Sequence, residues 1–302
     1  KKIPYNDFLK SMTMFFVNNE IDEKYFMLKK NKIASLKKQM SNIGTRAGLE
    51  SYIRSCPESI SNLLIVLGVS TETFKRVISM FRIERGMIFS SEWDANQLRR
   101  FILDDKDMMD KVCNLFLVGI GDSDLKSKIP GFRLCKFTID NTVLQRLNND
   151  DFLDFLVSKD FDTQYNSDVS QSNIGRVDEI LTRLNIDYNI EIIRNQNVDP
   201  VGNGTRDIQV NYMVGRNALN LPKFYIKYSF NTTTSRGQTD FKRSVKDLRD
   251  YIKNKNPEAK QIVIIDGAGW VGRQSDLKDV WDYSHYCLNL NNIETLKELL
   301  KQ

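Results

Sequence analysis

The chain has few of the residues that build metal clusters, and it has no long apolar run. Its 302 residues include one histidine, His285, and four cysteines at scattered positions: Cys56, Cys113, Cys135 and Cys287. A structural zinc site needs four such ligands at paired spacings, so the sequence excludes one. We expect buried, reduced thiols in a cytoplasmic protein. No apolar run approaches the length of about 20 residues that crosses a bilayer, and no signal peptide is readable.

What remains is the composition of a globular protein. Apolar residues make up 41% and charged residues 27% of the chain, which is long enough for two domains with separate cores. The net charge of +5 permits binding to nucleic acid without requiring it.

Patterning changes near residue 150. The first half has helical periodicity and the second half alternates strands with helices, which predicts a helical N-terminal domain (1–150) followed by an α/β domain (151–302). Helices are predicted at 7–18, 48–55, 96–104 and 150–158. The polar segment 162–173 is predicted to form part of the junction between the two domains.

Residues 60–82 predict a helix, a tight turn and a second helix. Gly68 can adopt the left-handed turn conformation, and Ser70 can cap the second helix. The second helix would present polar side chains suited to phosphates and base edges: Thr73, Lys75, Arg76 and Ser79. Leu64 stands where a small residue usually lets the helices approach, so an ordinary helical hairpin is the alternative to a helix-turn-helix.

The order of elements in the second half is helix, three strands, helix, strand. A helix is predicted at 175–184, strands at 188–193, 207–214 and 223–230, a basic amphipathic helix at 239–254, and a strand buried on both faces at 261–266.

This order, with "IDGAGW" (265–270), "RQSDL" (273–277) and the "NTTTSRGQ" turn (231–238), resembles the PD-(D/E)xK type II restriction endonucleases. The resemblance covers roughly residues 170–300 and includes the group that cuts at GATC. It implies a restriction-endonuclease-like mixed sheet flanked by helices, a double-stranded DNA substrate, Mg²⁺ as cofactor and a homodimer. By this resemblance Asp207 takes the place of the first metal-binding acid and Asp178 that of the helix acid, although Asp207 could instead be a cap at the start of its strand.

The third strand departs from the pattern of this family. Lys227 falls where the second acid is expected, and Ser229 where the motif lysine or its substitute is expected. In an alternative register Lys227 is the motif lysine and Tyr225 replaces the acid. All three side chains share one face of the strand, and neither register supplies the carboxylate that would hold Mg²⁺. The resemblance therefore predicts a nuclease whose metal site is disabled.

Three hypotheses about Lys227 stay open. The chain is an engineered or selected inactive variant, which we favour because one base change converts Glu to Lys and an active enzyme damages an unprotected host. Alternatively, the acid has migrated to Asp240 or Asp178, or the chain is a natural DNA-binding relative that no longer cuts.

DNA contacts are predicted independently of catalysis. A basic flank runs along the helix at 239–254 beside its apolar stripe, through Lys242, Lys246, Arg249 and Lys253, and an ordinary solvated surface is the alternative. Polar residues that could enter a DNA groove follow the third strand and the DGAGW turn: Asn231, Ser235, Arg236, Gln238, Arg273 and Gln274. For the residues near the third strand, a loop closed by its own hydroxyls is the alternative.

The sequence thus predicts a sequence-specific DNA endonuclease, with Lys227 at the position of a metal ligand. A noncatalytic DNA-binding or regulatory protein that uses the helix-turn-helix is the second hypothesis.

Overall fold

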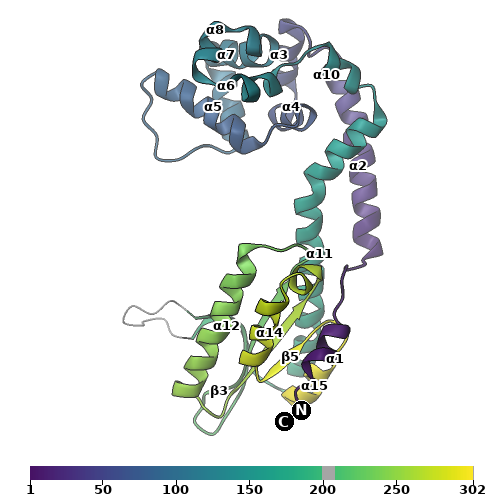
Figure 1. Ribbon diagram of the computed structural model, residues 1–302, viewed down its shortest axis with the longest axis vertical. Coiled ribbons are helices and arrows are strands. Elements are labelled where there is room, and N and C mark those ends of the chain that lie inside the picture. The colour runs from purple at the N-terminus through teal and green to yellow at the C-terminus, as the bar shows by residue number, and fades with distance from the viewer. Residues whose placement is uncertain (199–207, 302) are drawn as a thin grey trace. The chain divides into compact units, whose positions relative to one another are not determined.

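The structure is a computed structural model that describes residues 1–198 and 208–301. Within these residues it contains fifteen α-helices and one five-stranded sheet, so the predicted mixed α/β class with a helical N-terminal part is confirmed (Figure 1).

Contacts divide the chain into two compact units. One consists of residues Asp22–Thr163, and the other combines Lys1–Ile21 with Gln164–Gln302. We call them the helical unit and the sheet unit. Compared with the predicted division at residue 150, the sheet unit also includes the first 21 residues and begins again at Gln164.

The helical unit has one apolar core. Its helices are most of α2 (Asn19–Gln39), then α3 (Arg46–Ser55), α4 (Ser59–Leu67), α5 (Thr71–Glu84), α6 (Ala95–Asp104), α7 (Lys106–Leu117), α8 (Ser123–Lys128), α9 (Gly131–Leu134), α10 (Asn141–Arg146) and the start of α11 (Asp150–Tyr188). Side chains of α3, α5 and α7 such as Ile53, Phe74 and Phe116 are fully buried in that core, so the apolar stripes of short amphipathic helices account for its packing.

The sheet unit contains one mixed sheet with the order β1-β2-β3-β4-β5. Its strands are β1 (Ile192–Asn197), β2 (Gln209–Arg216), β3 (Pro222–Phe230), β4 (Lys260–Asp266) and β5 (Tyr286–Leu288). β1, β2 and β3 pair antiparallel, whereas β3, β4 and β5 pair parallel. The parallel crossover from β3 to β4 passes through α12 (Arg236–Lys255), as parallel pairing requires.

Helices cover both faces of this sheet. Val177, Leu181 and other residues of α11 pack with α15 (Thr295–Leu300) on one face. On the other face lie α12, α14 (Gln274–Tyr283) and α1 (Tyr5–Lys10), while α13 (Ala268–Val271) follows β4. β4 is buried on both faces, as its unbroken apolar run predicts.

Three predicted elements differ from the structure. The helix predicted at 7–18 ends at Lys10, and the chain then runs without regular structure to Asn19. Segment 162–173, predicted to be a junction, lies inside α11, because an apolar side chain recurs every fourth residue at Phe161, Tyr165 and Val169. The strand predicted at 188–193 begins at Ile192, after α11 ends at Tyr188.

The first residues of the chain are built into the sheet unit. Phe8 and Met12 lie in the core beside α14. The Thr13 amide donates to Oδ1 of Asp266 at 2.6 Å, and the Ala268 amide donates to the Met14 carbonyl at 3.0 Å. These contacts explain why residues 1–21 cluster with the sheet rather than with the helices that follow them.

Cysteine exposure is partly as predicted. Cys56, Cys113 and Cys287 are buried free thiols, whereas Cys135 is exposed, so the expectation of burial is wrong for Cys135. In the part of the chain that the structure describes, no helix has the length and apolar character needed to span a membrane.

Candidate functional site

The carboxyl ends of β3 and β4 lie next to each other, and the loops that leave them are in close contact. A Cβ atom on Gly267 would lie 2.2 Å from the Asn231 carbonyl oxygen, and one on Gly269 would lie 2.3 Å from that of Thr233. Gly267 also has a φ of +108°, which L side chains rarely adopt. The glycines of the DGAGW turn therefore allow the two loops to approach and form this edge of the sheet.

Lys227 is buried on the α12 face of β3, with a relative exposure of 6%. Its ammonium donates to the carbonyl oxygen of Gln209, at the start of β2, and lies 5.8 Å from the ring centroid of Phe241. Burial lowers the pKa of Lys227 from 10.5 to about 8, and the charge of Asp247 opposes this shift. The hydrogen bond of Lys227 connects β3 to β2, whereas removal of the ammonium from water opposes its burial.

Ser229 is two residues further along β3, so its side chain lies on the same face as that of Lys227. Its Oγ accepts hydrogen bonds from Asn231 Nδ2 at 2.7 Å and from Trp270 Nε1 at 3.2 Å. The structure thus brings together Ser229 and Asn231, both predicted from the sequence, with Trp270 of the DGAGW turn, whose side chain was not predicted to take part. Tyr225 lies further from this edge, where its hydroxyl accepts from Asn256 Nδ2 at 3.3 Å.

Of the two predicted acids, the one that the structure describes is not beside Lys227. Asp207 lies outside the described residues. Asp178 pairs with Arg194 at 3.1 Å, and its charge raises the pKa of Tyr212, which is already raised by burial. Tyr212 packs on the α11 face of the sheet, opposite the α12 face that holds Lys227. Within the described residues Asp178 and Lys227 therefore belong to opposite faces.

The donors around Lys227 do not fit a divalent cation. Across residues 1–198 and 208–301, His, Cys, Asp and Glu side chains form no group of three that could hold a metal ion. Apart from Asp247, whose charge acts on Lys227, the described groups that bond along this edge are an ammonium, a hydroxyl and amides. Mg²⁺ prefers carboxylate oxygens and is repelled by a fixed positive charge. The assignment of Asp178, Asp207, Lys227 and Ser229 to catalysis stays a prediction.

We expect Lys227→Met to stabilise the protein at pH 7 by about 2 kcal/mol. The gain from not burying a charge exceeds the loss of one hydrogen bond. The folded pKa of Lys227 is lowered from 10.5 to about 8, so between these values the unfolded chain binds more protons. Wild-type stability should rise with pH across this window, and the advantage of the variant should shrink.

Urea unfolding at pH 7 to 10.5 measures this difference, with Lys253→Met as the matched control because Lys253 is an exposed lysine of the neighbouring helix α12. Parallel stability profiles of wild type and Lys227→Met would show that the buried lysine carries no charge penalty.

Several residues predicted to contact DNA bond to one another within the sheet unit. Arg273 donates to the Ser235 carbonyl at 2.8 Å and pairs with Asp276 at 2.7 Å. Lys242 also pairs with Asp276 at 2.7 Å, and this hydrogen bond is the largest influence that lowers the pKa of Asp276. Gln238 is fully buried in a capping box with Ser235. These side chains order the start of α12, and their contact with DNA stays a prediction.

The remaining predicted DNA contacts are more accessible. Arg236 is 93% exposed in its side chain and lies in the first turn of α12, 3.9 Å from Asp240. Lys246 is half exposed and pairs with Asp250 at 2.7 Å. Arg236 could therefore reach a groove with the loss of a single surface ion pair.

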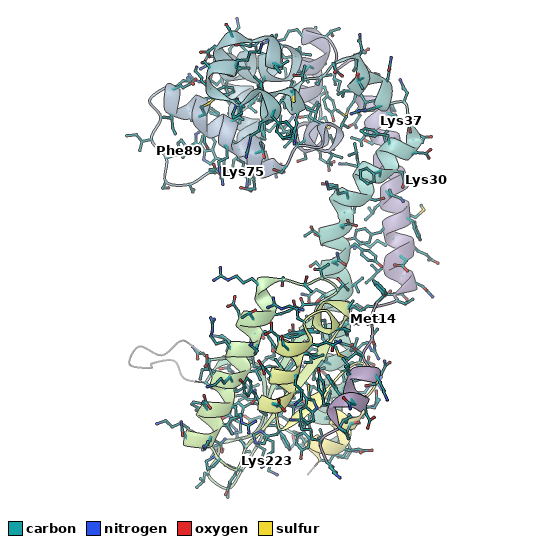
Figure 2. All side chains as sticks on the ribbon, in the orientation of Figure 1. Met14, Lys30, Lys37, Lys75, Phe89 and Lys223 are labelled. Carbon is teal, nitrogen blue, oxygen red and sulfur yellow. The ribbon has the colours of Figure 1, made fainter. Side chains whose placement is uncertain are left out.

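The predicted helix, turn and helix at 60–82 is confirmed. Gly68 ends α4 with a φ of +63°, and Ser70 Oγ accepts from the Thr73 amide at 3.2 Å. Lys75 projects from α5 and pairs with Glu72 at 2.9 Å (Figure 2). Ser79 was expected near the outer face, but it is buried and donates to Glu92. Whether this unit binds DNA stays a prediction.

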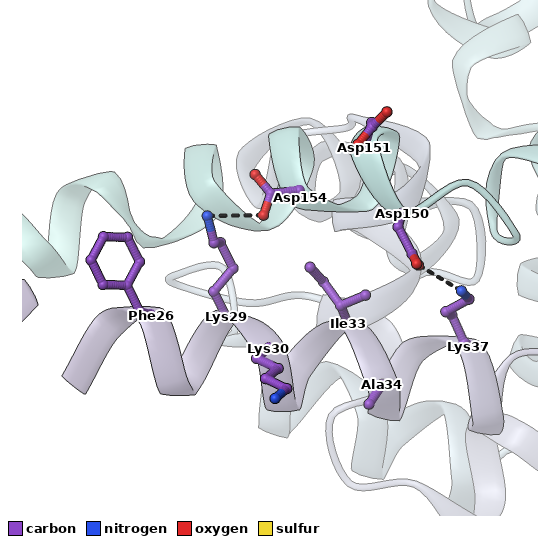
Figure 3. A pocket seen from close by; sticks show the side chains of 9 residues that line it. All are labelled: Phe26, Lys29, Lys30, Ile33, Ala34, Lys37, Asp150, Asp151 and Asp154. Atoms are coloured by element: carbon purple, nitrogen blue, oxygen red, sulfur yellow. Dashed lines mark hydrogen bonds and ion pairs between the residues drawn. The ribbon is translucent and has the colours of Figure 1, made fainter. Parts of the chain in front are cut away.

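A cavity of about 450 Å³ lies between α2 and α11 in the helical unit. Two ion pairs lie in its lining: Lys29 pairs with Asp154 at 2.9 Å, and Lys37 pairs with Asp150 at 2.5 Å (Figure 3). The pairs connect the two helices, so Asp150 and Asp154 serve as structural partners.

A family comparison relates the sheet unit to the restriction endonucleases. Residues 154–302 match the family model described as the BanI C-terminal domain, which belongs to a restriction endonuclease family. The match confirms the predicted resemblance at the level of a restriction enzyme, while the GATC-cutting group stays a prediction. Comparison with curated proteins and with solved structures gave no match.

Proposed function

We propose that the chain is a sequence-specific double-stranded DNA endonuclease of the type II restriction class, with catalysis disabled by Lys227. The match of residues 154–302 to a restriction-enzyme domain is the observation that supports this enzyme class. The order α11, β1, β2, β3, α12, β4 supports a PD-(D/E)xK core. In an intact core of this kind two acidic side chains would hold Mg²⁺, which would supply an activated water and neutralise the developing charge on the phosphate.

The buried ammonium of Lys227 supports the loss of activity. This ammonium lies beside the start of β2 and donates a hydrogen bond to the Gln209 carbonyl oxygen. A divalent cation at this position would be repelled by its charge. The described groups at the edge of the sheet can bind and orient phosphate oxygens, and the one carboxylate that ends β4, Asp266, is already bonded to three backbone amides. A palindromic recognition sequence would further call for a two-fold homodimer.

Binding and cleavage assays test this proposal separately. The chain should select a short palindromic sequence from random duplexes in EDTA, and it should leave plasmid uncut in Mg²⁺. Arg236→Gln should weaken selection at particular base pairs by about 1 to 3 kcal/mol. Failure of the wild-type chain to bind any duplex at low salt would contradict the proposal.

A noncatalytic DNA-binding regulator is the second candidate, and the confirmed α4–turn–α5 unit favours it. In that case Lys75→Gln combined with Arg76→Gln, rather than Arg236→Gln, should abolish sequence preference.

A further inference from the structure

A second cavity, of about 280 Å³, lies beside the turn between α4 and α5. Its lining combines this turn with the segment around α9: Gly68, Val69, Ser70, Thr73, Phe132, Arg133, Lys136 and Phe137. We call it the Arg133 cavity. No carboxylate is among the described residues that line it, so the charge of its walls is positive.

The two cations of the Arg133 cavity differ from ten other cations of the helical unit, which pair with carboxylates. Carboxylates pair with Lys29, Lys32, Lys37, Arg46, Arg54, Lys75, Arg76, Arg85, Lys111 and Lys128. Arg133 and Lys136 are exposed, and within the described ranges neither one forms an ion pair. Lys136 instead lies over the ring of Phe132, with 4.9 Å between Nζ and the ring centroid. What distinguishes Arg133 and Lys136 is that they share one concave lining without a carboxylate, a surface that can bind an anionic ligand.

The other walls of the Arg133 cavity fit a phosphodiester better than a simple anion. Ser70 Oγ and Thr73 Oγ1 lie 2.8 Å apart, and since only one hydroxyl hydrogen is used between them, the other can be donated to a ligand. Phe132 is 80% exposed and Phe137 is fully buried, so an apolar wall lies beside the charged groups. A phosphate group attached to a sugar would satisfy the cations and the hydroxyl while it covers the exposed ring.

We infer that the Arg133 cavity binds a backbone phosphate of duplex DNA, so that the helical unit contributes a phosphate contact. This inference rests on the proposed DNA-binding function. It adds a contact from the α9 segment, which the sequence patterns did not identify, to those predicted for α5. The contact would be independent of base sequence, because phosphates are present at every position.

The test compares the unmodified full chain with a double variant that carries Arg133→Gln and Lys136→Gln, which we call the cavity variant. Its matched control is Arg100→Gln with Lys106→Gln, which removes the same two charges from exposed positions of the helical unit outside the cavity. Affinity for random-sequence duplex is measured over a range of salt concentrations. We expect the cavity variant to bind all sequences more weakly and to flatten the salt slope by about one unit, while the control keeps the wild-type slope.

Inorganic phosphate provides the second probe, read as a shift in melting temperature. A phosphate-induced shift that the cavity variant loses, with unchanged duplex binding, would assign the site to free phosphate and overturn the DNA assignment. Equal slopes for wild type and cavity variant, with no phosphate effect, would reject the site while leaving the proposed function intact. Absence of any duplex binding by the wild-type chain would overturn both.

Discussion

Lys227→Glu is expected to restore Mg²⁺-dependent cleavage of duplex DNA, with a gain of at least about 100-fold over the chain with Lys227. A metal that activates water and stabilises charge supplies several kcal/mol, and each 1.36 kcal/mol changes a rate tenfold. The substitution replaces a buried ammonium by a carboxylate on the face of β3 that also carries Ser229. Plasmid nicking and linearisation in Mg²⁺ measure the gain.

Lys227→Gln is the control for this gain, since it removes the positive charge without supplying a metal ligand and should stay inactive. Metal binding gives a readout that does not depend on cleavage. The Glu variant places a carboxylate near the Gln209 carbonyl oxygen, so it should melt at a lower temperature in EDTA and recover in Ca²⁺ or Mg²⁺.

Two results would favour a natural loss of catalysis or a migrated acid over an engineered or selected change at Lys227. If the Glu variant binds DNA and stays inert, the chain is a natural relative that has lost catalysis for further reasons. If the chain with Lys227 already cuts, the acid has migrated, and Asp240→Asn or Asp178→Asn should abolish cleavage.

Asp266→Ala is expected to lower the free energy of unfolding of the sheet unit by about 3 to 5 kcal/mol. The carboxylate is fully buried and accepts three backbone amides, those of Thr13 at 2.6 Å, Gly267 at 2.9 Å and Leu290 at 2.9 Å. Burial raises the pKa of Asp266, and the amide donors oppose that shift. Alanine would leave three buried donors without an acceptor.

Urea unfolding followed by tryptophan fluorescence measures this loss. Asp282→Ala is the matched control, because Asp282 is a half-exposed acid of the same unit in a surface pair with Lys278 and should change stability by less than about 1 kcal/mol. Equal stabilities of the two variants would mean that the three amides find other acceptors.

The sequence predicts the sheet unit well where local patterns decide the structure. The alternation in β3, the apolar run of β4 and the stripe on α12 each follow from burial of one or both faces, and all three elements are present. The prediction for segment 162–173 was wrong because its many Ser, Asn and Asp side chains are typical of turns, while the helical period that holds it in α11 depends on few apolar residues.

The site was predicted less completely, because its partners come from distant parts of the chain. Strand periodicity correctly put Lys227 and Ser229 on one face, but no local pattern indicates that Trp270 donates to Ser229 or that Asp276 holds both Lys242 and Arg273. Side chains counted from the sequence as free for DNA turned out to be bonded internally. The register of the parallel strands and the packing of α14 on α12 determine those bonds.

The contacts made by the first residues also constrain the order in which the protein can fold during synthesis. Thr13 bonds to Asp266 across a sequence separation of 253 residues, and the same carboxylate bonds to Leu290. Translation proceeds at about 5 to 20 residues per second, so residues 1–21 must wait for tens of seconds before their partners emerge. The helical unit, Asp22–Thr163, is made entirely within that interval. It can fold on the ribosome, whereas Phe8 and Met12 stay exposed as chaperone-accessible apolar residues until residue 290 has left the exit tunnel.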